Sequence, residues 1–571
     1  MGNKTACGKS NICLILQSIV IGLIAFGIIY GFGPLNVTND RWIMSGYDEA
    51  DIIQHYAGWC AFRNSGWHYP IGLADNMGGG TYISFTDSIP WAAVLFKGIL
   101  ETVGYNGTFQ YFGIYGLLCY ILQALAVGLI VKRKTSNNLL ICICMLLLCF
   151  SPILMDRSLR HTALGSQWLM LFAMYAYLRF LDRGGRGFPA AFSVLSFLAV
   201  GIHPYFLPLV LVFSFLALLS GLYRKINMAG NFWGFVWSVV LPLAGGRLLG
   251  ALGSGVSATR DRFGYFSMNM NAILNPISRG DYEWSTVLKA HPQILGNYDG
   301  FNYLGLGYLF LILIAVLSFV IARPKFNRLK AFDTSMYVMA AVGMTMFAIS
   351  NVITFNDRIL ATIHLPEKIL NICGIFRASS RFFYFTYYSL VIFSLYRLFD
   401  VFSRPSVCEG EENIANPRHT ALPVCFTICV VAFLQFFDLG QVVVQKHNAM
   451  TEKLKFQSII NDYALAEAVK GKHYLICLSD PPDKSLSVFA SKNNLATSFS
   501  IANSGDYSAE WIKANRILDD FVAGVHSDDI VVAYKDIGVA KELFKKKEIN
   551  STSKYYESSG YAFLIANTKT P

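Results

Sequence analysis

Acidic, amide and imidazole side chains are concentrated in the segment YDEADIIQHYAGW, which spans residues 47–59. Two of its acids, Asp48 and Asp51, precede Gln54 and His55, which follow Asp51 within about one helical turn. A carboxylate with such neighbours can act as a general base, and it is a stronger base where water is scarce. The alternative is a capped helix start, because acids are also favoured in the first turn of a helix.

Four more side chains suited to acid–base or ligand chemistry fall in predicted loops on the same side of the membrane: Asp87, Asp156, His161 and His203. Asp87 equally suits the N-cap of a following helix, and Asp156 suits a simple helix end. His203, in GIHPY, equally suits a turn. Asp51, Asp87 and Asp156 would offer oxygen ligands to a divalent metal if they converged. Their spacing in the sequence does not show whether they converge, so the question of a bound metal stays open.

The composition is that of a membrane protein. The 571 residues are 54% hydrophobic and only 15% charged, and the mean hydropathy is +0.43. A soluble chain has about 25% charged residues. The net charge of +11 comes from basic residues gathered in short loops between apolar segments, which the positive-inside rule explains. No basic stripe lies outside these loops, so we expect no nucleic-acid partner.

Apolar segments predict a polytopic α-helical membrane protein with about eleven spans. These segments are 12–32, 111–131, 139–155, 167–181, 189–202, 205–223, 232–252, 303–322, 335–355, 382–399 and 422–443. Lys and Arg fall on alternate connections, which places the N-terminus in the cytoplasm and the C-terminal tail outside. The candidate chemical residues then lie on the outer side, because the long loop 33–110 and the loop 156–166 are both outer loops.

The tail changes character after residue 443. Strand-like runs (YLICL, IVVAY and YAFLIA) alternate with helix-like runs, which predicts a small extracytoplasmic α/β domain over residues 444–571. Residues 1–443 form the predicted transmembrane domain. No P-loop and no GxGxxG pattern occurs in the sequence, so a cytosolic nucleotide is not the expected energy source.

Seven short motifs, in order, carry a resemblance to a known family. They are DxxQHxxGW (51–59), FTDSIP (85–90), FQYFGIY (109–115), RHTALGSQWL (160–169), GYFSMNMNAILNP (264–276), YDGFNYLGLG (298–307) and FRASSRFFYF (376–385). Together they resemble bacterial multi-pass membrane glycosyltransferases of the GT-C type that depend on polyprenyl-phosphate sugars. Two positions depart from the pattern: Gln167 stands where a second histidine is expected, and Asp299 where a glutamate is expected.

The resemblance implies a sugar donor carried on polyprenyl phosphate (undecaprenyl phosphate in bacteria) and a cell-envelope glycan acceptor, such as O-antigen. Transfer would take place on the outer (periplasmic) face of the cytoplasmic membrane and would invert the anomeric centre. The matching catalytic acid is Asp51, with Asp48 as the fallback and Gln54 and His55 as supports. Some members hold a second acid at the position of Asp156.

Arg377 and Arg381, in FRASSRF, are the expected ligands of the donor phosphate. They lie on one face if that stretch is helical, and arginine suits forked phosphate contacts. The alternative is that they anchor a span at the interface. Two other function classes are a lipid-linked-glycan flippase or transporter and a non-catalytic assembly subunit. A transporter would more often carry ionisable residues in mid-span, where Arg247 is the only clear case here.

Overall fold

The computed structural model describes residues 2–46, 51–183, 189–252, 263–279, 282–321, 327–402, 421–451, 459–477, 484–502, 529–545 and 553–566. By its contacts the chain divides into two compact units. The first, the helical unit, consists of Met1–Asn36, Phe112–Pro242 and Ala258–Glu452. The second, the mixed unit, consists of Val37–Tyr111, Leu243–Ser257 and Lys453–Pro571. Most of the predicted outer loop 33–110 thus belongs with the tail, while the domain boundary predicted after residue 443 stays a prediction.

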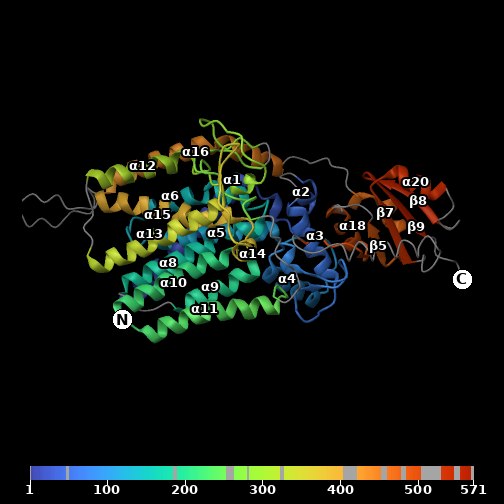
Figure 1. Cartoon of the computed structure of the whole chain (residues 1–571), viewed down its shortest axis with the longest axis horizontal. Helices are drawn as coiled ribbons and strands as arrows, with labels where there is room; N and C mark the ends of the chain where they lie inside the picture. The colour runs from blue at the N-terminus through green and yellow to red at the C-terminus, as the bar shows by residue number, and fades with distance from the viewer. Residues whose placement is uncertain are drawn as a thin grey trace, which may run out of the picture. The chain divides into compact units, whose positions relative to one another are not determined.

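Long apolar helices make up most of the helical unit. They are α1 (Gly2–Tyr30), α5 (Phe112–Val131), α6 (Asn138–Cys149), α7 (Pro152–Arg157), α8 (Trp168–Asp182), α9 (Pro189–Ile202), α10 (Phe206–Arg224), α11 (Met228–Leu248), α12 (Leu306–Ile321), α13 (Arg328–Ile349), α15 (Phe383–Phe402) and α16 (Ala421–Thr451). Figure 1 shows that the longer of these helices run in similar directions. Each apolar segment of the sequence falls on one or more of them.

Seven helices within the described residues are long and apolar enough to cross a membrane. They contain the stretches Asn11–Tyr30, Phe112–Val131, Phe206–Arg224, Met228–Leu248, Arg328–Ile349, Ser379–Phe402 and Leu422–Thr451. The helices α6, α9 and α12 are apolar but shorter. The protein is therefore a multi-pass membrane protein by its helices, and the count of about eleven spans stays a prediction.

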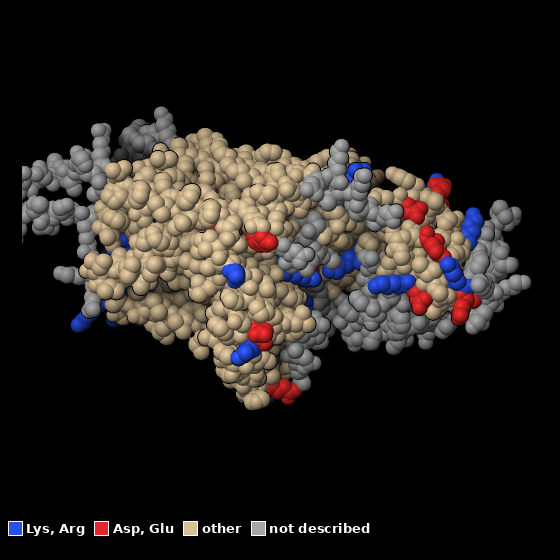
Figure 2. Space-filling view, turned by 90° about the horizontal axis from the view of Figure 1, so that it is seen from above, with Lys and Arg blue, Asp and Glu red and all other residues tan. Residues whose placement is uncertain are grey.

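The helix α15 is the core of the helical unit. In its most apolar stretch 83% of the residues are buried, against 17% in α13, and α15 packs against α12, α13 and α16. The view in Figure 2 shows a wide surface over the helical unit on which Lys, Arg, Asp and Glu are sparse. An exposed surface of this kind suits contact with lipid rather than water.

Two predicted spans are interrupted. Segment 139–155 is not one helix, because α6 ends at Cys149 and α7 begins with Pro152 at its first turn. Proline has no N–H to donate, which favours it at a helix start and disfavours it inside a helix. Segment 335–355 ends early, because Ser350 has a positive φ of 68°. The next residues form the strand β3 (Val352–Phe355), which pairs with β4 (Arg358–Thr362). The short helix α14 (Glu367–Gly374) follows this hairpin.

The mixed unit combines outer-loop helices with the tail. The loop residues form α2 (Arg41–Met44), α3 (Asp51–Asn64), β1 (Leu73–Ala74), β2 (Thr81–Tyr82) and α4 (Pro90–Thr102). The tail forms α17 (Tyr463–Ala468), β5 (Tyr474–Cys477), α18 (Lys484–Lys492), β6 (Ala496–Thr497), β7 (Ile530–Tyr534), α20 (Ile537–Lys545), β8 (Ser553–Ser558) and β9 (Tyr561–Ala566). The described tail strands form a sheet of order β6-β5-β7-β9-β8, parallel among the first three and antiparallel beyond.

Alternating apolar residues fill the core of this sheet. Ile476 of β5, Val532 of β7 and Leu564 of β9 are fully buried in one cluster, as expected for strands covered on both faces. The predicted strands in YLICL, IVVAY and YAFLIA correspond to β5, β7 and β9. The helical run predicted in AEWIKANRILDDFV lies outside the described residues.

Candidate functional site

A buried carboxylate, Asp299, is surrounded by basic side chains in the helical unit. It lies in the short 3₁₀ helix η5 (Asn297–Gly300) and is 8% exposed. Arg157, at the end of α7, donates from Nη1 to Oδ1 at 3.0 Å and from Nη2 to the main-chain oxygen at 2.7 Å. Arg381, in the 3₁₀ helix η6 (Ser379–Phe382), donates from Nε to Oδ2 and from Nη2 to Oδ1, each at 3.1 Å. Two guanidinium groups therefore face one carboxylate.

Arg157 also connects Asp299 to a second buried carboxylate, Asp156. The Nε atom of Arg157 lies 3.1 Å from Oδ2 of Asp156, and Nη2 of Arg160 lies 2.5 Å from the same oxygen. These contacts form a charge series, Arg160–Asp156–Arg157–Asp299–Arg381, which begins and ends with arginine. The Arg381 side chain is 12% exposed, more than any other in the series, so its end of the series is the more accessible one.

The two arginines fix the charge of Asp299. Burial on its own would raise the pKa of this carboxyl group, but Arg157 and then Arg381 outweigh that effect and hold the pKa well below its usual range. Asp299 is therefore an anion at neutral pH. Its role in the charge series is to neutralise arginine, and such a strong acid is unsuited to taking up a proton.

A network of amides holds the turn that carries Asp299. The Asn297 amide donates to the carbonyl oxygen of Ser267 at 3.0 Å, and the Thr354 hydroxyl donates to Oδ1 of Asn297 at 3.2 Å. Asn269 donates to the carbonyl oxygen of Asn356 at 2.7 Å. These bonds connect three segments: the motif around residues 267–271, the YDGF turn and the β3–β4 hairpin. They hold the Asp299 carboxylate in place.

The surroundings of Arg381 are aromatic. Its guanidinium group lies 4.6 Å from the centre of the Tyr205 ring, and the Tyr205 hydroxyl accepts a hydrogen bond from the Ala378 N–H at 2.8 Å. Because that bond holds residue 378 in a non-helical conformation, Arg377 precedes η6 instead of sharing a helix with Arg381. The stretch from Arg377 to Arg381 is therefore not one helix, and the condition for a common helical face is not met. The guanidinium carbon of Arg377 lies 5.7 Å from the centre of the Phe266 ring instead.

Both predicted outer histidines of the helical unit are buried and adjacent. The rings of His161 and His203 are 5.3 Å apart. The Nδ1 atom of His203 accepts a hydrogen bond from the Tyr205 N–H at 3.3 Å, which leaves Nε2 as the protonated nitrogen of the neutral ring. His203 thus stabilises a turn, as its sequence context suggested. That turn places Tyr205 against Arg381.

In the mixed unit, the motif DxxQHxxGW forms the first two turns of α3. Asp51 is the first residue of this helix and is half-buried, while Gln54 and His55 are buried. The spacing of Asp51, Gln54, His55 and Gly58 puts them on one face. The Nε2 atom of Gln54 is buried and has no hydrogen-bond partner within the described part of the chain. Asp48 lies outside the described residues.

The turn FTDSIP packs on that face of α3. The Ser88 hydroxyl donates to the carbonyl oxygen of His55 at 2.6 Å and lies 2.8 Å from the Thr86 hydroxyl. A side chain at Gly58 would place its Cβ 2.3 Å from Oγ1 of Thr86. The absence of a side chain at Gly58 is therefore what lets the turn approach the helix.

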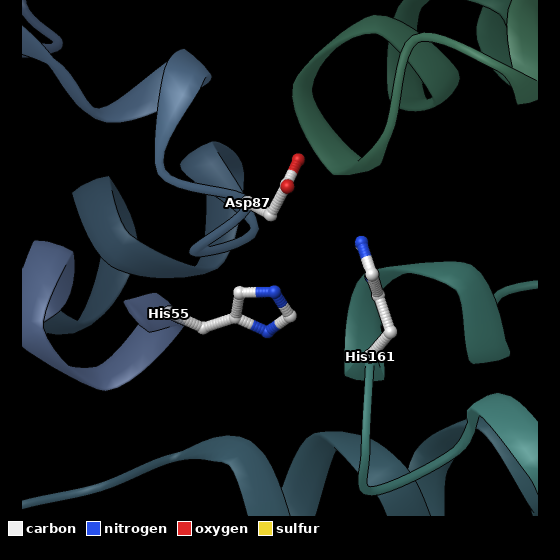
Figure 3. Close-up of side chains that lie close together, drawn as sticks. All are labelled: His55, Asp87 and His161. Atoms are coloured by element: carbon white, nitrogen blue, oxygen red, sulfur yellow. The ribbon is translucent and has the colours of Figure 1, made fainter. Parts of the chain in front are cut away.

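The same turn brings Asp87 to His55, and a carboxylate oxygen and a ring nitrogen of the two lie within 4.8 Å of each other. Figure 3 draws both side chains, together with His161 of the helical unit. Asp87 has a positive φ of 56°, a conformation that is costly for a residue with a side chain. The N-cap alternative for Asp87 is wrong, because the N-cap position of α4 is occupied by Ile89, two residues later.

A third carboxylate of the mixed unit, Asp40, joins α3 to the tail. The Tyr56 hydroxyl donates to Oδ2 of Asp40 at 2.9 Å, and Nζ of Lys492, at the end of α18, lies 2.5 Å from the same oxygen. Burial, then Cys60 and Asp40, raise the pKa of Tyr56, so its hydroxyl keeps its proton. The amide of Asn64 also donates to the Ser491 carbonyl at 2.5 Å. The tail thus supports the helix that carries Asp51.

Sequence reasoning missed the residues that hold Arg381. In the sequence Asp299 stands out only as a departure from a family motif, and no pattern pairs it with Arg381. The Ser380 hydroxyl donates to the Asp299 main-chain oxygen at 3.1 Å. The available signal was a set of polar residues, Asp156, Arg157 and Asp299, at the ends of apolar segments. The roles assigned to the candidate site residues stay predictions.

Comparison with known proteins gives a family match and similarities to solved structures, among them two of an archaeal oligosaccharyltransferase. The family described as "Domain of unknown function (DUF6311)" matches residues 19–440. An archaeal oligosaccharyltransferase, AglB from Archaeoglobus fulgidus, in complex with an inhibitory peptide and a dolichol-phosphate, superposes with a TM-score of 0.43 at 10% identity. The oligosaccharyltransferase of Archaeoglobus fulgidus tethered to an acceptor peptide through a disulfide bond gives 0.45, also at 10% identity.

Both alignments cover 97% of this chain and 74% of the other chain. No curated protein matches the sequence.

Proposed function

The chain belongs to the DUF6311 family, which matches most of its length, and we propose that it is a membrane glycosyltransferase. It moves a sugar from a polyprenyl-phosphate carrier to a cell-envelope glycan, such as O-antigen. The reaction takes place at the outer face of a bacterial cytoplasmic membrane. The donor phosphate is bound at the Arg381 end of the charge series, and Asp51 accepts the proton of the acceptor hydroxyl.

The observation that carries this proposal is the pairing at Asp299. Arg157 and Arg381 both contact Asp299, and Arg157 also contacts Asp156. With Arg160 the series holds three arginines and two carboxylates, with Arg381 at its more exposed end. An unbalanced buried cation is costly, and an anionic ligand beside Arg381 would offset that cost. A phosphate suits this place, because an arginine fork and a phosphate match in geometry. Arg381 also lies at the start of a membrane-length helix, where a lipid-linked phosphate would be found.

The proposed reaction is one displacement. The acceptor oxygen forms a bond with the anomeric carbon, and the bond from that carbon to the phosphate oxygen breaks. The electron pair leaves with the polyprenyl phosphate, whose negative charge rises as a diester becomes a monoester. Arg381 stabilises that developing charge. The acceptor proton passes to the Asp51 carboxylate, and a single displacement inverts the anomeric centre.

Gln54 and His55 support Asp51 from the same face of α3. The Nε2 donor of Gln54, which has no partner among the described residues, suits a hydroxyl of the acceptor sugar. His55 and Asp87 also supply an imidazole nitrogen and a carboxylate oxygen within 4.8 Å, a donor pair that fits a divalent cation. Such an ion would add positive charge beside α3. Metal dependence of sugar transfer is open to experimental test.

The experiment that tests the phosphate site uses the part that all such donors share. Undecaprenyl phosphate and undecaprenol are offered to the purified protein in nanodiscs, and bound lipid is measured by native mass spectrometry. We expect the phosphate to bind more tightly than the alcohol. Arg381→Ala should weaken the binding of undecaprenyl phosphate by about 10- to 150-fold, the equivalent of one charge-assisted contact of about 1.5–3 kcal/mol. The binding of undecaprenol should not change.

Arg224→Ala is the matched control. Arg224 also forms a partly buried ion pair, with Asp333, in the helical unit, so its loss carries a similar structural cost without touching the proposed phosphate site. Equal effects of the two variants, or equal binding of the phosphate and the alcohol by the wild type, would show that Arg381 is a structural residue only. A flippase would also bind the phosphate, so sugar transfer is the test that separates it from an enzyme.

A further inference from the structure

We propose that residues 352–375, which comprise the β3–β4 hairpin and α14, lie in the lipid–water interface of the bilayer. This interfacial segment would insert its isoleucine and leucine side chains among the lipid acyl chains nearest the head groups. The proposal concerns how the protein contacts the membrane. It does not depend on the sugar-transfer reaction.

The interfacial segment exposes large apolar side chains. Six of them are between 44% and 67% exposed: Ile359, Leu360, Ile363, Ile369, Ile372 and Ile375. Single exposed apolar residues are ordinary on protein surfaces, but six gathered in one short segment mark a contact surface. The arrangement therefore calls for a partner.

Strand β4 is apolar and exposed on both faces. Ile359 and Leu360 are consecutive, so their side chains point to opposite sides of the strand, yet they are 58% and 57% exposed. Neither face packs against a protein core. A two-stranded hairpin in water is marginal by itself, and an apolar medium around both faces removes the cost of exposing them.

The position along the chain identifies that medium as the membrane. Val352 follows the end of α13, at Ile349, by three residues, which reach about 10 Å at most. At the other end, Ile375 precedes the membrane-length stretch Ser379–Phe402 by four residues. The interfacial segment therefore joins two membrane-length helices and stays close to the ends of both.

The exposed surface of α13 leads directly to the interfacial segment. Val338, Val342 and Met346 repeat at intervals of four on that helix and are at least half-exposed, as expected for a face in contact with lipid. Polar residues are also present where head groups would lie: Arg358 begins β4, and Glu367 and Lys368 begin α14. An apolar surface bordered by charges is typical of segments that lie along an interface.

The test places an environment-sensitive fluorescent residue, dansylalanine, at position 360 of the full chain in nanodiscs. A site-specific fluorophore avoids the native tryptophans and cysteines. Nanodiscs are made with phosphatidylcholine that carries either ordinary or brominated acyl chains, because bromine quenches only fluorophores that contact those chains. The same residue at position 463, where Tyr463 is 88% exposed in the tail, is the control.

We expect emission from position 360 to shift to shorter wavelength and to fall by at least half in brominated lipid. Emission from position 463 should stay water-like and unquenched. Water-like, unquenched emission at 360 would overturn the proposal, because the segment would then lie in solvent. A short-wavelength emission that brominated lipid does not quench would overturn it too, since protein, such as a second copy of the chain, would then cover the surface.

Discussion

Arg381 donates two parallel hydrogen bonds to the Asp299 carboxylate, from Nε to Oδ2 and from Nη2 to Oδ1, each 3.1 Å long. Arg157 approaches the same carboxylate from another helix. Parallel bonds of this type fix the orientation of the guanidinium plane as well as its position. Asp299 thereby determines how Arg381 can meet an anionic ligand, and the proposed phosphate site depends on an acid that never titrates near neutral pH.

Asp299→Asn should destabilise the helical unit by about 3–5 kcal/mol, because it leaves two buried arginines without the carboxylate that they share. Asparagine keeps the size of the side chain, so the loss reports on charge. The midpoint of thermal unfolding in detergent measures it. Asp357→Asn, at an exposed carboxylate, should change stability by less than about 0.5 kcal/mol. Similar midpoints for the two variants would refute the structural role of Asp299.

The contribution of Asp299 should depend on pH in a defined direction. Its pKa is lower in the folded protein than in the unfolded chain, so the stabilisation is complete above the ordinary pKa of Asp, about 4. It is lost as the pH falls through the lowered folded pKa. The difference in unfolding midpoint between wild type and Asp299→Asn should therefore stay constant from about pH 8 to pH 5 and narrow below pH 4. A difference that already narrows between pH 7 and pH 5 would contradict the assignment.

Asp51→Asn should lower the rate of sugar transfer by roughly 100-fold or more while the protein stays folded, since asparagine cannot take up the acceptor proton. Asparagine caps a helix about as well as aspartate, so a purely capping role predicts normal transfer. The rate is measured in membranes matched for the amount of protein. Asp48→Asn is the companion variant. Loss in Asp48→Asn with normal transfer in Asp51→Asn would move the base to Asp48, and normal transfer in both would show that neither acid is the base.

The helices of this protein could be located from sequence because burial in lipid or protein leaves long apolar runs. Their interruptions were harder to see. Pro152 divides an apolar run into α6 and α7, and the apolar residues 352–355 form a strand instead of the last turn of a span. Strand β8 was missed because its sequence, SKYYES, is mostly polar. It pairs with β9 through its main chain.

The candidate site was only partly predictable, for a physical reason. Asp299 and Arg157 are 142 residues apart in the chain, and Arg381 is 82 residues from Asp299. Sequence pattern reports on local periodicity, so it led to Arg381 as a proposed phosphate ligand by residue type but not to the carboxylate that Arg381 contacts. The face of α3 was predictable, because residues 51, 54, 55 and 58 lie within two turns of one helix.

Lys492→Met should loosen α3 without emptying the proposed phosphate site. It removes the ion pair with Asp40, which also holds the Tyr56 hydroxyl, and should cost about 1–2 kcal/mol for a pair that is partly exposed. Amide hydrogen exchange in residues 51–64 should become faster, and undecaprenyl phosphate binding should not change. Lys492→Arg keeps the charge and should restore slow exchange. Unchanged exchange in Lys492→Met would mean that the tail does not support α3.

Gly58→Ala should disturb the packing of the FTDSIP turn on α3. The new Cβ would lie 2.3 Å from Oγ1 of Thr86 and 2.7 Å from Oγ of Ser88, distances that force the turn away and should cost about 1–3 kcal/mol. The displaced turn carries Asp87, so sugar transfer should fall as well. Gly98→Ala, in α4, is the matched control, because nothing lies within 4 Å of its added Cβ and alanine favours a helix over glycine by about 0.5–1 kcal/mol. A double-mutant test uses Thr86→Gly, which removes the nearest clashing atoms. In that background Gly58→Ala should lower the stability by less than it does in the wild type. Equal costs in the two backgrounds would show that the close approach of Gly58 and Thr86 does not limit this packing.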